Sequence, residues 1–428
     1  MTTTIAAETI VRARALMAQG DLAEADAALV DALNAVPDDP ELLYLRGVIA
    51  SRQGAHEAAI VVLRAAIGAA PQMGLAWLAL GHAYLRLGGL AEAVAAYERA
   101  ADCEPSWPDP HFNLAVTRRR LNDLPNAARS FYAAWWRDPG MADAAKGCVG
   151  TLAALVRSGA GPSLPLPVMR EPEPRSVSVV VCSIDDDKAA NVTALYERLL
   201  ASVRHEVIVL RDARSLAEAY NRGVARSTGE IVVLSHDDID ILATDFAARL
   251  LRHLERYDVV GVIGGTRMTG PLPIWAGHPH LRGWITHAAA SAEWQADLLH
   301  PAPVAGAVVV LDGVLLAARR AVFAAVGFDA HTFDGFHGYD VDWSYRAAQA
   351  GYTLAAAGDL LLVHASRGRY DDVWQRYAER LCAKHCVGHI DPAPPPYYET
   401  AFTSRQQVQS FYGMLLKWAE ENKPESST

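Results

Sequence analysis

Four polar side chains in a run of five residues are of the types that hold a divalent metal ion. The run His236-Asp237-Asp238-Ile239-Asp240 follows directly on the apolar stretch 230–235. Carboxylate oxygens are preferred ligands of Mg²⁺ and Mn²⁺, and an ion held here could carry a diphosphate. A polar turn with an aspartate that caps a helix would contain the same residue types. The spacing therefore predicts a metal site, with a polar turn as the alternative.

The surrounding sequence alternates strands and helices in a way that would place these residues at a sheet edge. Runs rich in β-branched residues at 177–184, 206–212 and 230–235 are separated by helical stretches at 191–200 and 216–226. This alternation indicates an α/β fold with a parallel sheet covered on both faces, which binds ligands at the carboxyl ends of its strands. The sequence has no G-x-G-x-x-G after the first strand and no P-loop. A dinucleotide oxidoreductase and a P-loop NTPase are therefore disfavoured.

A second acidic motif, Gly338-Tyr339-Asp340-Val341-Asp342, places Asp340 100 residues after Asp240. Between and around the two motifs stand Arg211-Asp212, the stretch 219–223, the segment 311–329 and a strand that ends in Val363-His364. In this order, the motifs from about Ser176 to His389 resemble inverting nucleotide-sugar glycosyltransferases of the GT-A fold, in the large family two. The resemblance implies a GT-A fold, a nucleoside-diphosphate sugar as donor, UDP- or GDP-linked, and Mn²⁺ or Mg²⁺ as cofactor.

The resemblance implies roles for the acidic residues. Asp238 and Asp240 stand at the metal-binding Asp-x-Asp of the family, while a His-x-Asp form, here His236 and Asp238, is similar to a subgroup related to streptomycin-pathway proteins. Asp340 stands at the second acid of the Glu-Asp motif, with Tyr339 in place of the glutamate, and would be the catalytic base. His364 would be a third metal ligand; a phosphate-facing or structural histidine is the alternative.

The donor-binding positions follow from the same resemblance. They are Ser183, Asp185, Asp212, Asn221 and Asp237. Asn221 matches the asparagine of the family's Arg-Asn motif, in which Tyr220 replaces the arginine. Arg367 and Arg369, which follow the last strand, would neutralise the diphosphate or lie on the surface.

The two acidic motifs suit displacement of a nucleoside diphosphate from the anomeric carbon of a sugar. Negative charge builds on the leaving oxygen, and a cation held by carboxylates stabilises it. The attacking hydroxyl must lose a proton, and Asp340 as acceptor would contribute about 10²–10⁴-fold in rate. One base and one in-line displacement invert the anomeric centre. A glycoside hydrolase needs a protonated acid and no diphosphate clamp, which fits this cluster less well.

Two functions from other classes remain as alternatives. The domain could be a catalytically inactive scaffold, in which case the chain would act by binding other proteins. It could instead be a sugar-phosphate nucleotidyltransferase, but no glycine-rich basic loop for a triphosphate follows the first strand.

Three further groups of residues have both a functional and a structural interpretation. Trp275, His278 and Trp284 could stack on an acceptor sugar or pack on the sheet. Cys382, His385, Cys386 and His389 could bind zinc, but no second ligand pair lies nearby, and a buried cysteine face is favoured. A C-terminal amphipathic helix with Val408, Phe411, Leu415 and Trp418 on one face is expected to pack on a domain or on a second copy of the chain, which would make a homo-oligomer.

The first third of the chain is a repeat with a period of 34 residues. Its markers are Gly20, Gly54, Gly88 and Asn122, and then Pro37, Pro71, Pro105 and Pro139. The third unit resembles the tetratricopeptide motif most closely, through Trp77, Leu80, Gly81, Tyr84, Ala93, Tyr97, Ala100 and Pro105. Each unit is expected to be a helical hairpin, and about four stacked units would form an all-α superhelix with a groove for a peptide or protein. Arg52, Arg86 and Arg120 share one position of the repeat and would form a basic ladder for an acidic partner, or a solvated helix face.

The organisation expected from these features has four parts. A repeat domain covers 1–158, a proline-rich linker 159–175, a GT-A domain 176–392, and a proline break with the amphipathic helix 393–428. The net charge of −10 disfavours nucleic acid as a partner. Five cysteines without a disulfide framework favour a cytoplasmic location, and no transmembrane segment is expected.

Overall fold

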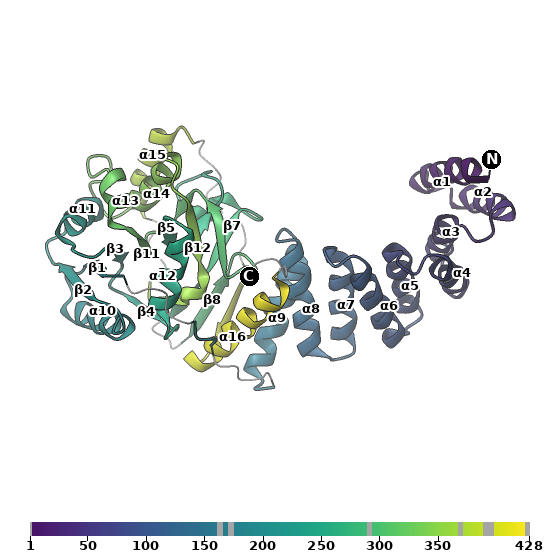
Figure 1. Ribbon diagram of the computed structural model, residues 1–428, viewed down its shortest axis with the longest axis horizontal. Coiled ribbons are helices and arrows are strands. Elements are labelled where there is room, and N and C mark those ends of the chain that lie inside the picture. The colour runs from purple at the N-terminus through teal and green to yellow at the C-terminus, as the bar shows by residue number, and fades with distance from the viewer. Residues whose placement is uncertain are drawn as a thin grey trace. The chain divides into compact units, whose positions relative to one another are not determined.

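The computed structural model describes most of the chain in two compact units, Met1–Leu152 and Ala153–Thr428 (Figure 1). The described residues are 2–160, 166–169, 175–288, 293–366, 371–387 and 398–423, without the side chains of 2–4 and 274–275. Arg367, Arg369 and His389 lie outside the described residues, as does the side chain of Trp275. Within the described ranges, no helix combines the length and the apolar character needed to cross a bilayer.

The first unit consists of helical hairpins, as the repeat predicts. The helices are α1 (Thr2–Gln19), α2 (Leu22–Ala35), α3 (Pro40–Arg52), α4 (His56–Ala69), α5 (Gly74–Arg86), α6 (Leu90–Cys103), α7 (Pro108–Arg120), α8 (Leu124–Arg137) and α9 (Ala142–Arg157). Helices α3, α5, α7 and α9 begin 34 residues apart, and so do α2, α4, α6 and α8. The turn residue Asn122 has φ 60°, in the same left-handed region as Gly20, Gly54 and Gly88, because asparagine tolerates that region.

Small residues inside each hairpin let its two helices approach. A Cβ atom on Gly81 of α5 would lie 2.4 Å from the Tyr97 ring of α6, and one on Gly47 of α3 would lie 2.5 Å from Leu63 of α4. The glycines therefore create the space that these larger side chains fill. This packing explains why the small residues recur with the period of the repeat.

The main sheet of the second unit has the strand order β2-β1-β3-β11-β5-β12-β9. The strands are β1 (Val177–Cys182), β2 (His205–Leu210), β3 (Ile231–Ser235), β5 (Val259–Gly261), β9 (Val304–Val308), β11 (Leu315–Arg319) and β12 (Leu354–Ala357). Strands β1, β2 and β3 are parallel, as expected. The sheet is nevertheless mixed, because β11 runs antiparallel to both β3 and β5. An apolar strand has the same residue pattern in either direction, so the sequence of β11 does not distinguish parallel from antiparallel pairing.

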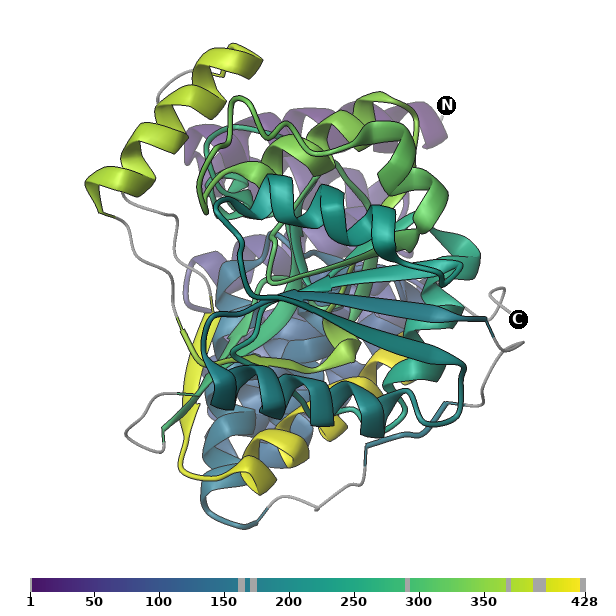
Figure 2. The same cartoon turned by 90° about the vertical axis from the view of Figure 1, so that its left-hand side faces the viewer.

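Helices cover both faces of this sheet (Figures 1 and 2). They are α10 (Asp186–Leu199), α11 (Leu216–Arg226), α12 (Phe246–Arg256), α13 (Arg320–Val326) and α14 (Tyr339–Gln349). Residues of α11, α13 and α14 share one apolar core with Val180, Val232 and Leu316 of the strands. On the other face, Tyr196 of α10 contacts Phe246 of α12, with ring centroids 6.0 Å apart.

A second sheet extends the unit with the order β10-β6-β7-β13-β4, and β8 joins β7 to β14. Its strands are β4 (Ile239–Ile241), β6 (Ile263–Gly265), β7 (Leu281–Ala288), β8 (Trp294–Leu298), β10 (Val310–Leu311), β13 (Leu362–His364) and β14 (Tyr398–Phe402). Helices α15 (Asp372–His385) and α16 (Arg405–Asn422) complete the unit, with short 3-10 turns at Pro273–Ala276 and Gly358–Leu360. The predicted apolar face of α16 is buried, at Val408, Phe411, Leu415 and Trp418, and Phe411 contacts Phe402 of β14.

Part of the proline-rich stretch is attached to the second unit. The backbone N–H of Met169 donates to the Asp245 carboxylate, 2.6 Å away, and Arg249 donates to the carbonyl of Pro167. Arg249 is only 2% exposed and also pairs with Asp245 and Asp359. These contacts fix residues 166–169 against α12.

Candidate active site

A cavity of about 380 Å³ lies at the carboxyl ends of β1 and β3, where the sequence places its acidic run. Residues from distant parts of the chain line it, among them Ser183 after β1, Tyr220 on α11, His236 and Asp238 after β3, Phe336 before α14, and Ser366 after β13. A cavity of this size is within the range of small-molecule sites. The first and third strands end side by side because they are parallel neighbours, which brings these segments together.

Three nitrogen and oxygen atoms converge beside this cavity. His364 Nε2 lies 3.2 Å from Asp238 Oδ1 and 3.3 Å from His236 Nδ1, and all three ligand atoms lie within 4.8 Å of one another. Bonds of about 2.0–2.2 Å to one ion place two ligands at right angles about 3 Å apart. The observed separations match that spacing, so His236, Asp238 and His364 fit a metal ion.

Neighbouring groups lower the pKa values of His236 and Asp238, which favours the protonation states that bind a cation. Burial and the adjacent His364 lower the pKa of His236, which keeps its imidazole neutral. Burial opposes ionisation of Asp238, but hydrogen bonding and charge from His364 outweigh it and lower the pKa of that carboxyl group. The hydroxyl of Tyr339 lies 3.4 Å from His236 Nε2 and can hold that nitrogen as the donor, which leaves Nδ1 free for a metal.

Asp240 has a different environment from the one the Asp-x-Asp pattern implies. Its carboxylate pairs with Arg405 at the start of α16 and accepts the N–H of Ile241 at 2.7 Å. The structure therefore brings His236, and not Asp240, together with Asp238 and His364. The physical reason is the register of β4 and β13: Asp240 is opposite Val363, one residue away from the histidine.

Asp340 lies in the first turn of α14 and is 8% exposed. One of its carboxylate oxygens accepts the N–H of Gly313 at 2.7 Å. Burial and the nearby Asp312 raise the pKa of Asp340 to about 7. A carboxylate with this property accepts a proton more readily than an ordinary aspartate does. A Cβ on Gly313 would lie 2.8 Å from the Cβ of Asp340, so glycine is needed for this approach.

Two of the predicted donor-binding residues meet at the cavity. Ser183 donates a 2.7 Å hydrogen bond to Asp237, and both line the cavity. The Lys188 ammonium lies 3.9 Å from the other oxygen of Asp237. Asp185 lies beside them and caps α10, because its carboxylate accepts the N–H of Lys188 at 3.0 Å.

Asp185 does not itself line the cavity, and neither do the remaining two predicted donor-binding residues, Asp212 and Asn221. Asp212 accepts two hydrogen bonds from Arg222, at 2.7 and 2.8 Å. Its side chain lies on the surface and is 71% exposed. Asn221 uses its amide and its carbonyl to bind the backbone of Phe328, each at 2.8 Å. Asn221 thus fixes the segment that leads from α13 towards α14.

The aromatic and cysteine groups are largely structural. Trp284 is fully buried, donates to the carbonyl of His300 at 2.6 Å and stacks on Tyr412 with ring planes at 12°. The interpretation of Trp284 as a sugar platform is therefore wrong. His278 packs against Tyr398, with ring centroids 4.7 Å apart. His385 binds Asp342 at 2.9 Å, and the described residues contain no metal cluster besides the one at His236.

The sequence motifs assign no role to four further contributors to this site. Ser366 lies 3.1 Å from His364 Nε2, and Asp312 acts on the pKa of Asp340. Ile184 and Phe336 are exposed apolar residues at the cavity. Each depends on chain segments that meet only in the fold.

Models of two known protein families match parts of this chain. Residues 178–383 match the model of a family described as glycosyltransferase like family, and residues 10–74 and 50–115 match models of the tetratricopeptide repeat. The chain joins tetratricopeptide repeats to a glycosyltransferase-like domain. The glycosyltransferase-like match includes all of β1 but its first residue, and also His236, Asp238, His364 and α14 with Asp340; it ends within α15.

Solved structures similar to this chain include repeat proteins. A MamA fragment from Desulfovibrio magneticus RS-1 is 18% identical, with 36% of this chain and 86% of that chain covered and a TM-score of 0.33. YrrB, described as a TPR protein with an unusual peptide-binding site, is 23% identical, with 34% and 75% covered and a TM-score of 0.31. No curated protein matches the chain.

Proposed function

We propose that the glycosyltransferase-like domain is a metal-dependent, inverting enzyme that moves a sugar from a nucleoside-diphosphate sugar to a hydroxyl acceptor. The observation that carries the proposal is the convergence of His236, Asp238 and His364 beside a cavity, with the buried carboxylate of Asp340 adjacent in the chain to Tyr339, whose hydroxyl lies 3.4 Å from His236. A cation site and a proton acceptor are the two parts that such a displacement needs.

In the proposed reaction the residues of the chain have separate tasks. When bound, the metal ion would offset the charge that develops on the leaving diphosphate. Asp340 would take the proton from the acceptor hydroxyl, and Asp312 would favour this transfer by raising the pKa of Asp340. Ser183 orients Asp237 at the cavity, and Tyr339 orients His236. Attack by the acceptor on the face opposite the leaving group would invert the anomeric centre.

The donor set also favours one class of metal ion. Two imidazoles and one carboxylate suit Mn²⁺ and other first-row transition ions better than Mg²⁺, which prefers oxygen ligands and water. We therefore propose Mn²⁺ rather than Mg²⁺ as the better ion for this site, with Asp240 outside the set because Arg405 holds it.

Calorimetric titration with UDP, GDP, CDP and dTDP, each without metal, with Mn²⁺ and with Mg²⁺, tests this function. We expect one nucleotide to bind, and Mn²⁺ to tighten the binding more than Mg²⁺ does. Absence of binding to all four would contradict the proposal and favour a scaffold. Pyrophosphate release from a nucleoside triphosphate and a sugar phosphate would favour a nucleotidyltransferase instead.

The repeat domain is proposed to recruit the acceptor or a partner protein. Arg52, Arg86 and Arg120 are exposed at the last turns of α3, α5 and α7. Among the described residues none of the three forms an ion pair, whereas Arg46 and Arg118 pair with Asp26 and Glu98. The guanidinium group of Arg52 donates to the carbonyl of Met17 at 3.4 Å, which leaves its charge without an acidic partner in the described part of the chain. Three guanidinium groups without an ion pair in equivalent positions suit an acidic segment. Replacing all three by glutamine should weaken binding of an acidic peptide library, and unchanged binding would indicate a solvated helix face.

A further inference from the structure

A serine hydroxyl lies beside the three proposed metal ligands. Ser366 Oγ is 3.1 Å from His364 Nε2. The other two ligand atoms, Asp238 Oδ1 and His236 Nδ1, are 3.2 and 3.3 Å from the same nitrogen. Burial acts to raise the pKa of Asp238, whereas contact with His364 and a hydrogen bond from Ser366 lower it. The Ser366 hydroxyl is therefore spaced from His364 as the ligand atoms are, and it also contacts Asp238.

The short segment that ends at Ser366 is held at each of its three residues. His364 belongs to β13, where it is opposite His287 of β7. The N–H of Ala365 donates to the carbonyl of Asp238 at 2.9 Å, which ties this segment to the segment that carries the other ligands. The carbonyl of Ser366 accepts a hydrogen bond from His287 Nδ1, 3.1 Å away. The position of the Ser366 hydroxyl is therefore fixed by its own backbone.

His287 is itself in contact with a buried acidic side chain. Asp297 of β8 is 6% exposed, and one of its oxygens lies 3.6 Å from His287 Nε2. Its other oxygen accepts the Gln295 amide at 3.0 Å. A carbonyl oxygen only accepts hydrogen bonds, so His287 Nδ1 carries the proton that it donates to Ser366. His287 is not among the converging ligand atoms, and it supports Ser366 instead.

The cavity lies on one side of these groups. His236, Asp238 and Ser366 line it, whereas His364 does not. An octahedral ion bound by four protein atoms keeps two positions for other ligands, and a diphosphate supplies oxygens for such positions. A ligand set that includes Ser366 therefore has most of its members at the cavity in which the diphosphate is proposed to bind.

Resting on the function proposed above, we propose that Ser366 is a fourth protein ligand of the metal ion, through its hydroxyl oxygen. A hydroxyl is a neutral oxygen donor of the kind that Mn²⁺ and Mg²⁺ accept. Metal binding takes up the lone pair of His364 Nε2, so the hydroxyl then donates its proton to Asp238 instead. This leaves the lone pairs of the hydroxyl oxygen for the ion.

The test compares the intact protein with Ser366→Ala, Ser366→Cys and, as a control from the same cavity, Ser183→Cys. Calorimetry measures the affinity for Mn²⁺, alone and with the nucleoside diphosphate that binds best. Ser366→Ala should bind Mn²⁺ about tenfold more weakly or worse, because a ligand is lost, with an unchanged melting temperature. Ser183→Cys should bind Mn²⁺ within about twofold of the unchanged protein, since Ser183 lies outside the ligand set.

The Ser366→Cys variant reports ligation directly. A thiol that coordinates a metal loses its proton, and the soft sulfur favours Co²⁺ and Zn²⁺ over Mn²⁺. Co²⁺ bound by a thiolate has a sulfur-to-metal charge-transfer band. The unchanged protein, which has Cys182 at the same cavity, supplies the baseline. We expect the band in Ser366→Cys, and its absence from both the unchanged protein and Ser183→Cys.

Nucleotide binding without metal separates this inference from the function on which it rests. Ser366→Ala should keep that affinity within about twofold. Its loss, with Mn²⁺ binding retained, would overturn the inference and assign Ser366 to the diphosphate. Mn²⁺ binding that Ser366→Ala leaves unchanged, or a Co²⁺ spectrum of Ser366→Cys without the thiolate band, would overturn it as well. Failure of the unchanged protein to bind Mn²⁺, alone or with any nucleotide, would instead overturn the proposed metal-dependent function.

Discussion

The phenol rings of Tyr220 and Tyr339 lie in contact, with centroids 5.7 Å apart and planes at 60°. Both residues are buried, at 1% and 4% exposure. They are also two positions at which the sequence departs from the family-two pattern, which has arginine in the first place and glutamate in the second. Two residues of opposite charge in that pattern are thus replaced here by two neutral rings that touch. The two departures are coupled in space, although 119 residues separate them in the chain.

Because the two rings touch, substitutions at Tyr220 and Tyr339 should have non-additive effects on the free energy of unfolding. Tyr339→Glu alone should destabilise the protein by about 3 kcal/mol, because it buries a carboxylate beside Asp340. Tyr220→Arg alone should cost a similar amount by burying an unpaired cation. The double variant should be less destabilised than the sum of the two, by about 1 kcal/mol or more. Urea denaturation of all four proteins measures this coupling, and strictly additive losses would show that the two positions do not form a pair.

The metal-ligand set predicts opposite results for two residues of the same short run. His236→Ala should remove the tightening of nucleotide binding by Mn²⁺, because one of three converging ligands is lost. Asp240→Asn should keep most of that tightening, since its carboxylate is engaged by Arg405. Calorimetry with and without Mn²⁺ distinguishes them. If Asp240→Asn loses the metal effect and His236→Ala retains it, the Asp-x-Asp assignment is correct and the proposed histidine ligand is not.

The buried carboxyl group of Asp340 links activity to stability. Asp340→Asn should lower transfer by about 10²–10⁴-fold and leave nucleotide binding within about twofold, because only the proton acceptor is lost. The folded-state pKa of about 7 is above the ordinary value, so ionisation of Asp340 opposes folding. The unchanged protein should therefore lose stability as the pH rises from about 4 towards 7. At pH 8 the variant should be more stable by roughly 1–3 kcal/mol, and at pH 4 nearly equal. Equal stability at both pH values would show that this group is not perturbed.

Asp312 provides a separate test of the base. Its negative charge helps to raise the pKa of Asp340, so Asp312→Asn should lower that pKa. Asparagine can still accept the N–H of Val314, which Asp312 now accepts at 2.9 Å, so the turn is preserved. In a profile of transfer rate against pH, the acidic limb should move to lower pH by about one unit. A limb that does not move would mean that a group other than Asp340 accepts the proton.

Features set by local spacing were predictable from the sequence. The period of 34 residues fixed the hairpins of the first unit, and helix α11 occupies 216–226 as expected. The acidic run lies at the end of β3, as predicted, because a buried apolar strand ends where the sequence becomes polar. Local spacing also indicated the buried face of α16.

Features that depend on distant segments were not predictable in the same way. Arg405 reaches Asp240 across 165 residues of sequence, and nothing near Asp240 marks that pairing. The direction of β11 and the burial of Trp284 under α16 likewise depend on which strands become neighbours. Sequence patterns report the face and the period of an element, whereas these contacts are decided by packing.

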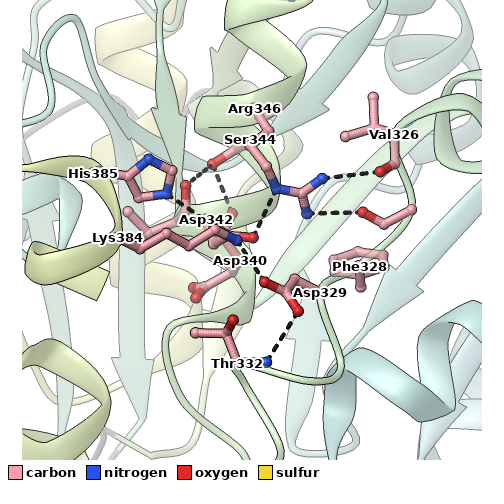
Figure 3. A network of polar contacts seen from close by, with 12 residues as sticks. Val326, Phe328, Asp329, Thr332, Asp340, Asp342, Ser344, Arg346, Lys384 and His385 are labelled. Carbon is pink, nitrogen blue, oxygen red and sulfur yellow. Dashed lines mark hydrogen bonds and ion pairs between the residues drawn. The ribbon is translucent and has the colours of Figure 1, made fainter. Parts of the chain in front are cut away.

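The charge network around Asp342 predicts a large difference between two lysines. Lys384 is 26% exposed and contacts the carboxylates of Asp329 and Asp342 (Figure 3). Without Lys384, Asp329 would lose its cation. The fully buried Asp342 would keep only Arg346 and His385 as partners. Lys384→Met should therefore destabilise the second unit by roughly 2–4 kcal/mol. Lys423 pairs with Glu420 on the surface, at 46% and 68% exposure, and Lys423→Met should cost less than about 0.5 kcal/mol. Thermal melting measures this difference. Equal melting temperatures for the two variants would show that the charge network around Asp342 does not stabilise the second unit.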